Sequence, residues 1–266
     1  MSKQKKFYLL LLSTFLGLFC LNLRSNVVVA RSSFTMGILE NDKPYSYKND
    51  QNWQGFSIEL AHQLEEVTDT KINFKAYSSQ EKMQTALKNG QIDFILGDKA
   101  NFSKSYQSTK AFLYPKNILF TRHDSKTKKL DKMLHKKVGL LKSGQQQALL
   151  KELGLKPVVF ADPTELLEAL EKSQISAGIL SDYSYHALLK AEPTLAKVPT
   201  TATKAEKNAV LHRISDPNVL ALSLSLITHG HPKINETLTE GINELRSTEK
   251  IAELSQKYFT KDLTLN

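Results

Sequence analysis

Two aspartates in similar sequence contexts are the residues of this chain best placed to bind a cation. The stretch ALKNGQIDFILGD ends at Asp98, and about 84 residues later the similar stretch ALEKSQISAGILSD ends at Asp182. A carboxylate forms charge-assisted hydrogen bonds with an ammonium or guanidinium group. If both side chains face one cleft, the site is rich in negative charge and favours a solute that carries such a group.

The repeated stretch also predicts how each aspartate is positioned. Each copy has the pattern of an amphipathic helix end, a tight polar turn and a short buried strand that delivers the aspartate at its carboxyl end. Ligands bind at the carboxyl ends of strands in open α/β sheets, so two copies predict two similar lobes around a shared cleft. The alternative is chance similarity between two ordinary helix-turn-strand units, with Asp98 as a helix N-cap or turn residue.

Both halves of the chain alternate strands and helices in the same order. This alternation predicts an α/β fold with mostly parallel sheets flanked by helices. After Pro199 the pattern predicts one more strand and two helices that return to the first lobe. The expected strands are 33–39, 71–77, 92–96, 117–122, 137–141, 157–161, one ending at 180, and 219–227; the expected helices begin near 55, 80, 145, 164, 183, 234 and 251.

Residues 1–30 have the pattern of a cleavable secretory signal. Three lysines precede an apolar run from Phe7 to Leu23, and small residues near Ala30 offer a cleavage site, so the mature chain is expected to begin at Arg31. Lipidation at Cys20 is disfavoured because the residue before it is the bulky Phe19. An uncleaved anchor is the alternative, since the run is nearly long enough to span a bilayer.

The charge and the cysteine count exclude several kinds of protein. Loss of the signal would leave 32 basic against 27 acidic residues, a mild net charge of +5 that is spread along the chain. A nucleic-acid-binding protein would gather its Lys and Arg on one element, so no nucleic-acid partner is expected. Because Cys20 is the only cysteine, disulfides, thiol catalysis and Cys-ligated metals are excluded from the mature chain.

Several short motifs occur in an order and spacing that resemble one known family. The chain is similar to the bacterial extracellular solute-binding proteins of family 3, the polar-amino-acid type of periplasmic binding protein, and the resemblance covers nearly the whole mature chain. The motifs are PYSY at 44–47, GFSIELA at 55–61, GQID at 90–93, KVG at 137–139 with Ser143-Gly144 after it, and QKYF at 256–259.

This resemblance implies two α/β lobes joined by two crossing segments, with the ligand cleft between the lobes. It places the first part of lobe 1 at 31–117, lobe 2 at 118–226, and C-terminal helices that return to lobe 1 at 227–266. The crossings are then expected near 114–118 and 217–226. Residues 208–217 also resemble the hinge strand of the family, which leaves an earlier second crossing as the alternative.

The resemblance also implies a set of ligand-binding residues. A typical member pairs the ligand carboxylate with an arginine of lobe 1 and the ligand ammonium with aspartates, one of them at the position of Asp182. Backbone N–H groups at Ser143 and Gly144 are expected to receive an anion. The arginine is missing from 99–104, so Lys104 or Lys99 would have to supply the positive charge.

Aromatic residues and other polar groups complete the candidate site. Tyr45 and Tyr47 are expected to flank a cationic ligand through cation-π or stacking contacts, with packing under the first loop as the alternative. His229 and His231 could ligate a metal, but a polar loop explains them better. Ser181, Asp182 and His186 lack the nucleophile elbow of a hydrolase.

The function that these residues favour is solute capture outside the cytoplasm. We expect a monomeric periplasmic protein, with no enzymatic activity, metal or cofactor, that captures a small polar solute, such as an amino acid or a related amine. It would deliver this solute to the membrane permease of an ABC importer. The alternatives are a ligand-sensing or degenerate non-transport binding protein of the same fold and, less favoured, an enzyme similar to amino-acid-precursor dehydratases.

Overall fold

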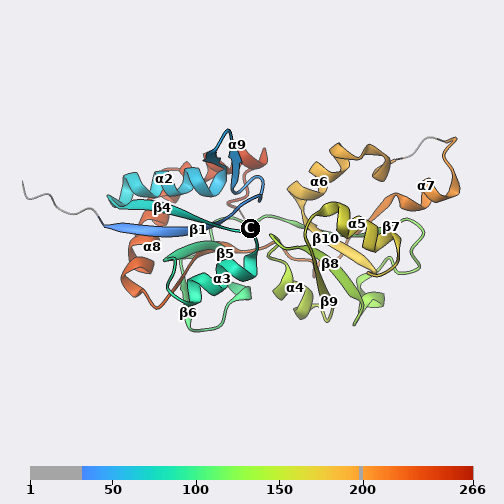
Figure 1. Cartoon of the computed structure of the whole chain (residues 1–266), viewed down its shortest axis with the longest axis horizontal. Coiled ribbons are helices and arrows are strands. Elements are labelled where there is room, and N and C mark those ends of the chain that lie inside the picture. The colour runs from blue at the N-terminus through green and yellow to red at the C-terminus, as the bar shows by residue number, and fades with distance from the viewer. Residues whose placement is uncertain (1–31, 198–199, 266) are drawn as a thin grey trace, which may run out of the picture. The chain divides into compact units, whose positions relative to one another are not determined.

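The computed structural model describes residues 32–197 and 200–265, which form two five-stranded sheets and one two-stranded hairpin (Figure 1). The expected signal segment at 1–30 lies outside the described residues. Each large sheet carries helices on its faces, so the predicted mixed α/β fold is confirmed. No helix among the described residues combines the length and the apolar character that a membrane span requires.

The first sheet has the strand order β4-β1-β5-β12-β6. Strand β1 pairs in parallel with β4 and β5, whereas β12 pairs antiparallel with β5 and β6. The strands are β1 (Ser33–Leu39), β4 (Lys71–Tyr77), β5 (Phe94–Asp98), β6 (Tyr106–Ser108) and β12 (Leu224–His229), and the separate hairpin is β2 (Tyr47–Asn49) with β3 (Asn52–Gln54).

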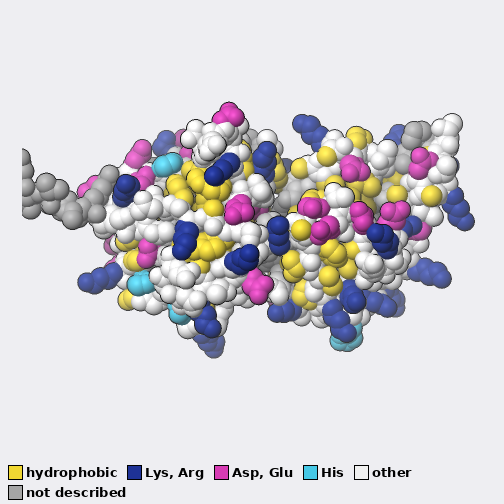
Figure 2. Space-filling model, viewed as in Figure 1, with side chains coloured by type: hydrophobic (Ala, Val, Ile, Leu, Met, Phe, Trp, Pro, Cys, Tyr) yellow, Lys and Arg dark blue, Asp and Glu magenta, His cyan; other side chains and the backbone are white. Residues whose placement is uncertain are grey.

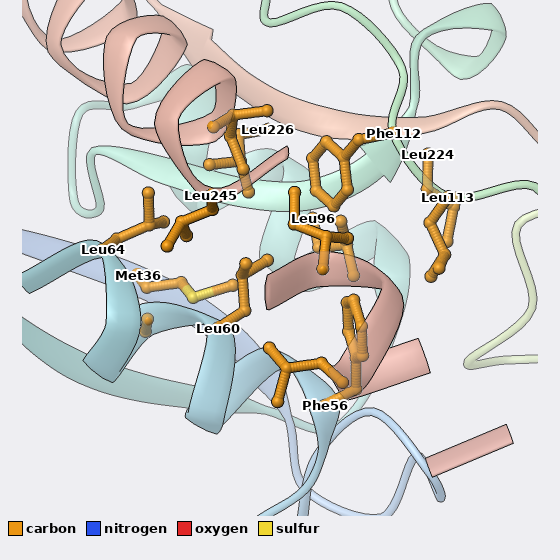
Figure 3. Packing of buried hydrophobic residues seen from close by; sticks show 14 of the residues in the cluster. Met36, Phe56, Leu60, Leu64, Leu96, Phe112, Leu113, Leu224, Leu226 and Leu245 are labelled. Atoms are coloured by element: carbon orange, nitrogen blue, oxygen red, sulfur yellow. The ribbon is translucent and has the colours of Figure 1, made fainter. Parts of the chain in front are cut away.

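Helices α2 (Phe56–Thr68), α8 (Pro232–Ser247) and α9 (Lys250–Phe259) pack together over one face of the first sheet, and α3 (Gln80–Lys88) packs against its strands from the other face. The main apolar core lies under the first group (Figure 3), where Met36 of β1 meets Leu60 and Leu64 of α2. Burial of these side chains supplies most of the drive to form this layer. We call the first sheet with these four helices lobe 1.

The second sheet has the order β11-β7-β10-β8-β9 and forms lobe 2 with its own helices. Its two faces carry separate apolar clusters, because alternate strand residues point to opposite sides: Leu119 joins one cluster, and Ile118 and Phe120 join the other. The elements are β7 (Asn117–Arg122), β8 (Lys137–Leu141), α4 (Gln147–Glu152), β9 (Lys156–Phe160), α5 (Pro163–Glu171), β10 (Ala177–Ser181), α6 (Asp182–Ala191), α7 (Lys204–Ala209) and β11 (Leu211–Ile214), with short 3-10 turns at Leu130–Met133 and Pro193–Leu195. A further 3-10 turn, Lys99–Asn101, follows β5 in lobe 1.

The chain passes between the lobes twice. It leaves lobe 1 after Leu113, enters β7 at Asn117, and returns between Ile214 of β11 and Leu224 of β12. The strand expected at 219–227 therefore starts later, because the residues before Leu224 form the crossing. The boundary expected at 226 falls inside β12, which pairs with β5 of lobe 1 and so belongs to the first lobe.

Three of the sequence motifs hold distant segments together. In the GQID motif, Asp93 accepts a hydrogen bond from the Thr35 backbone N–H at 2.6 Å and fixes the turn before β5 to β1. In the GFSIELA motif, Glu59 of α2 accepts hydrogen bonds from Lys257 Nζ at 2.6 Å and from the Tyr258 hydroxyl at 2.7 Å. The QKYF motif thus ties α9 to α2.

Replacing Glu59 with glutamine should destabilise lobe 1 modestly. Burial opposes ionisation, but the hydrogen bonds from Lys257 and Tyr258 lower the pKa of Glu59 overall, so its stabilisation is present above the ordinary glutamate pKa and lost as the pH falls. Because the pair is partly exposed, Glu59→Gln should reduce the free energy of unfolding at pH 7 by about 1 kcal/mol.

Urea unfolding of Glu59→Gln at pH 7 and pH 4 would measure this effect, with Glu66→Gln on the exposed side of the same helix as the control. The deficit should be smaller at pH 4 than at pH 7, because the carboxylate of the unfolded wild type is then mostly protonated and must lose this proton to form the ion pair on folding. A deficit of equal size at both pH values would contradict the ionic role.

Candidate functional site

A narrow cavity of about 40 Å³ lies between the lobes. Lobe 1 contributes the loop after β1, lobe 2 contributes the loop after β8 and the end of β10, and the second crossing contributes one leucine. The lining residues are Asp42, Tyr45, Leu141, Ser143, Gly144, Gln145, Gln146, Ile179, Leu180, Ser181, Ser184 and Leu222.

Asp42 is the acid that lies in this cavity. The Ser143 side chain, which comes from the other lobe, also lines this cavity and lowers the pKa of the Asp42 carboxyl. Desolvation nevertheless raises the pKa of Asp42 to about 7, and burial together with the nearby Asp42 charge raises the pKa of Tyr45. The cavity therefore holds a carboxyl group that is poised between its neutral and charged forms near neutral pH.

Asp98, at the end of β5, is buried beside this cavity without lining it. Its carboxylate accepts hydrogen bonds from the backbone N–H of Ala100 at 3.0 Å and of Ser223 at 3.4 Å, so it caps the following 3-10 turn and contacts the second crossing. Burial raises the pKa of Asp98, and these two hydrogen bonds oppose the shift. Its own backbone N–H donates to Gln145 Oε1 at 2.7 Å.

Asp182 lines a second cavity, of about 250 Å³, together with Tyr45, Tyr114 and Phe259. One carboxylate oxygen accepts a hydrogen bond from Lys261 Nζ at 2.6 Å, and the other lies 3.3 Å from a ring nitrogen of His186. The Lys261 side chain extends from the segment after α9, so this ion pair connects lobe 1 with lobe 2. Asp182 already has a cationic partner in the chain itself.

A one-residue difference separates the two aspartates of the repeated stretch. Strands β5 and β10 correspond at an offset of 83 residues, since position 94 matches 177 and position 98 matches 181. The counterpart of Asp98 is therefore Ser181, and each of the two caps the helix that follows it. Asp182 is one residue further along, inside α6, and so neither cavity is lined by both aspartates.

The structure brings together some of the other predicted site residues and leaves two apart. Tyr45, Ser143 and Gly144 line the small cavity. Tyr47 lies in β2, with Lys43 Nζ 5.0 Å from its ring centre, and Lys104 is exposed. Neither residue lines the cavities found among the described residues.

Several residues of the cleft were not predicted from the sequence. Asp42 carries a signal in hindsight, because an acid two residues before the Pro44-Tyr45 pair lies in the predicted first loop. Gln145 and Gln146 belong to a run of glutamines directly after Gly144, which is an unusual start for a helix. Lys261 had no local signal, since its partner is 79 positions away in the sequence.

The two candidate metal ligands lie at the end of β12 and at the start of α8. The ring of His229 stacks against Tyr106 with 4.4 Å between the ring centres, and His231 precedes the first turn of α8. Within residues 32–197 and 200–265, no group of three or more His, Cys, Asp or Glu side chains is arranged to hold a metal ion.

The chain is similar to known proteins along most of its length. A family model described as bacterial extracellular solute-binding proteins, family 3, matches residues 34–261. The "arginine-binding extracellular protein ArtP" of Bacillus subtilis (strain 168) is 22% identical over 268 residues, which cover 96% of this chain and 98% of ArtP.

Solved structures share the fold at low sequence identity. An ancestral arginine-binding protein bound to arginine has a TM-score of 0.63 and 18% identity, and the match covers 86% of this chain and 99% of that one. A histidine kinase sensor domain with similarity to periplasmic binding proteins has a TM-score of 0.66 and 18% identity, and the match covers 87% of this chain and 97% of that one.

The carboxyl group of Asp42 should make stability depend on pH. The folded pKa of Asp42, about 7, lies above the ordinary aspartate value, so the folded state binds this proton more tightly than the unfolded state. The free energy of unfolding therefore falls as the pH rises from 4 to 7. Asp42→Asn should therefore be more stable than wild type at pH 8, by roughly 2 kcal/mol, and nearly equal to it at pH 4.

Denaturant unfolding at the two pH values would measure this difference, with the exposed Asp131→Asn as the matched control. A wild-type pH profile in Asp42→Asn would show that the carboxyl ionises freely in solvent and is not desolvated in the cleft.

Proposed function

Because the chain belongs to the bacterial extracellular solute-binding proteins of family 3, we propose that it captures a small cationic solute, such as a basic amino acid or a related amine. The capture takes place in the periplasm, and the solute is then delivered to the membrane permease of an ABC importer. Closure of the two lobes around the solute is the expected motion.

The proposal of a cationic solute is supported by the acids at the interface of the lobes. Asp42 and Asp182 line the two adjacent cavities, and Asp98 is buried beside the first. Among the described residues that line these cavities, none is an arginine. Tyr45 borders both cavities and offers a ring to an ammonium or guanidinium group. Lys116 and Lys261 line the second cavity beside Asp182 and Asp262, whereas Asp42 is the one charged residue among the described ones that lines the first, so a solute with only negative charge would meet an acid there.

The named relatives support the same class of solute. ArtP is described as an arginine-binding protein, and the ancestral protein with the same fold was solved with arginine. Basic side chains of this chain are interspersed with acidic ones on the face in Figure 2, unlike the single basic face of a nucleic-acid-binding protein. The family and its named relatives are binding proteins, so the dehydratase-like alternative has no support.

A ligand-sensing role is the second candidate, because a histidine kinase sensor domain shares the fold. Sensing and transport require the same capture step and differ in the fate of the bound solute. A strain that lacks this protein should lose uptake of the radiolabelled solute if the protein serves an importer. Normal uptake in that strain would favour the sensing role.

A thermal-shift screen of the chain from Arg31 onward should reveal the solute class. Basic amino acids and polyamines should raise the melting temperature, whereas succinate and glutamate should not, because a solute at 100 times its Kd stabilises by roughly 2.7 kcal/mol. Asp182→Asn should weaken binding of the cationic hit by about tenfold or more, since the solute would lose a charged partner.

The control for that variant is Asp131→Asn, which removes an exposed carboxylate that lines neither cavity. Titration calorimetry would compare the three proteins. A shift with acidic or neutral solutes alone would refute the cationic preference, and unchanged affinity in Asp182→Asn would remove this aspartate from the site.

A further inference from the structure

The loop before α4 extends its own side chain across the cleft. Gln145, which belongs to lobe 2, accepts the hydrogen bond of the Asp98 backbone N–H of lobe 1 at 2.7 Å through its side-chain oxygen. The Gln145 backbone carbonyl accepts a second hydrogen bond, from Asn101 Nδ2 of lobe 1, at 2.8 Å. The Oδ1 atom of the same asparagine accepts from the Ala148 N–H at 3.0 Å. Gln145 is thus held from two sides by the opposite lobe.

Neighbouring residues of this loop are bound to lobe 1 and to the second crossing as well. The Gln80 backbone N–H, at the start of α3, donates to the Lys142 carbonyl at 3.0 Å. Gln146 is only 3% exposed and donates to Asn117 Oδ1 at 3.1 Å, and Asn117 in turn donates to the Leu220 carbonyl at 2.7 Å. These contacts connect the loop to α3 of lobe 1 and, through Asn117 at the start of β7, to the second crossing segment.

The cavity next to Gln145 is small, and its chemistry suits an uncharged side chain. The cavity between Asp42, Tyr45 and this loop measures about 40 Å³, which is much smaller than the cavity of about 250 Å³ that Asp182 lines. A carboxamide suits this position because its oxygen satisfies the Asp98 N–H without adding a charge beside the Asp42 and Asp98 carboxyls. Gln145 and its hydrogen-bond partners thus occupy part of the space between the lobes, and cavities of about 250 and 320 Å³ lie beside them.

We propose that Gln145 is an internal occupant of the cleft, which holds the lobes closed without a solute and competes with solutes for the Asp98 N–H. The inference rests on the proposed function for the identity of the competing solute, and on the lobe contacts alone for the closed solute-free state. A solute that enters must first displace the Gln145 side chain, so the affinity of the protein is set partly by this residue.

The closed state can be tested without any solute. The one cysteine of the sequence, Cys20, precedes Arg31, so Lys88→Cys on α3 and Glu152→Cys on α4 give a labelled pair with one site in each lobe. Spin-label distances should show a single short separation in the wild-type background. Gln145→Ala should add a population with a clearly longer separation, whereas the exposed Gln147→Ala should not.

A second variant tests whether the opening in Gln145→Ala comes only from the loss of local packing. Gln145→Glu keeps the size of the side chain but places a negative charge beside Asp98, and it should open the lobes at pH 8 more than at pH 5. An open wild-type protein, or equal distances in wild type and Gln145→Ala, would overturn the proposal.

Affinity provides the competition test. If a solute is found, Gln145→Ala should bind it about 2- to 10-fold more tightly, the range expected when one competing hydrogen bond is removed. Weaker binding would make Gln145 a ligand contact and overturn its role as a competitor. Absence of binding in both proteins would count against the proposed function, whereas the solute-free distances would still decide whether Gln145 closes the cleft.

Discussion

The antiparallel pairing of β12 with β5 is the constraint on which the rest of the structure depends. It places Leu224, which follows the whole of lobe 2 in the chain, opposite Asp98 of lobe 1. The chain must therefore cross between the lobes twice, and the last two helices must pack on the first lobe. The same pairing brings the Ser223 N–H to Asp98, and the tail after α9 then reaches Asp182 through Lys261.

Elements with a strong local signal could be predicted from the sequence, and those decided by non-local pairing could not. Helix α3 begins at Gln80 as expected because the Ser79 side chain caps its first turn. The start of β12 was placed too early, at 219 instead of 224, because apolar alternation continues through the crossing. Only the position of the partner strand decides which part of such a segment is a strand.

The candidate site was harder to predict, because direction and burial of polar groups depend on contacts between lobes. Asp98 and Asp182 share a sequence context, yet a shift of one residue turns one into a cap and places the other on α6 beside Lys261. Asp42 was not predicted as a site residue, because its raised pKa comes from burial in the fold, which the local sequence does not show. Gln145 is uncharged and carries no sequence signal for its contact across the cleft.

A cleft that the protein partly fills with its own side chains changes what solute affinity measures. The binding free energy is the difference between the contacts of the solute and those of Gln145 and Lys261 that it replaces. A solute carboxylate would gain the Asp98 N–H but would approach two carboxyl groups, and desolvation would cost it part of that gain. A cationic group instead gains electrostatic free energy in the cleft, because it stabilises the ionised form of Asp42. The acids and Gln145 therefore act together. Both favour solutes whose positive charge gains enough binding free energy to offset the cost of displacing Gln145.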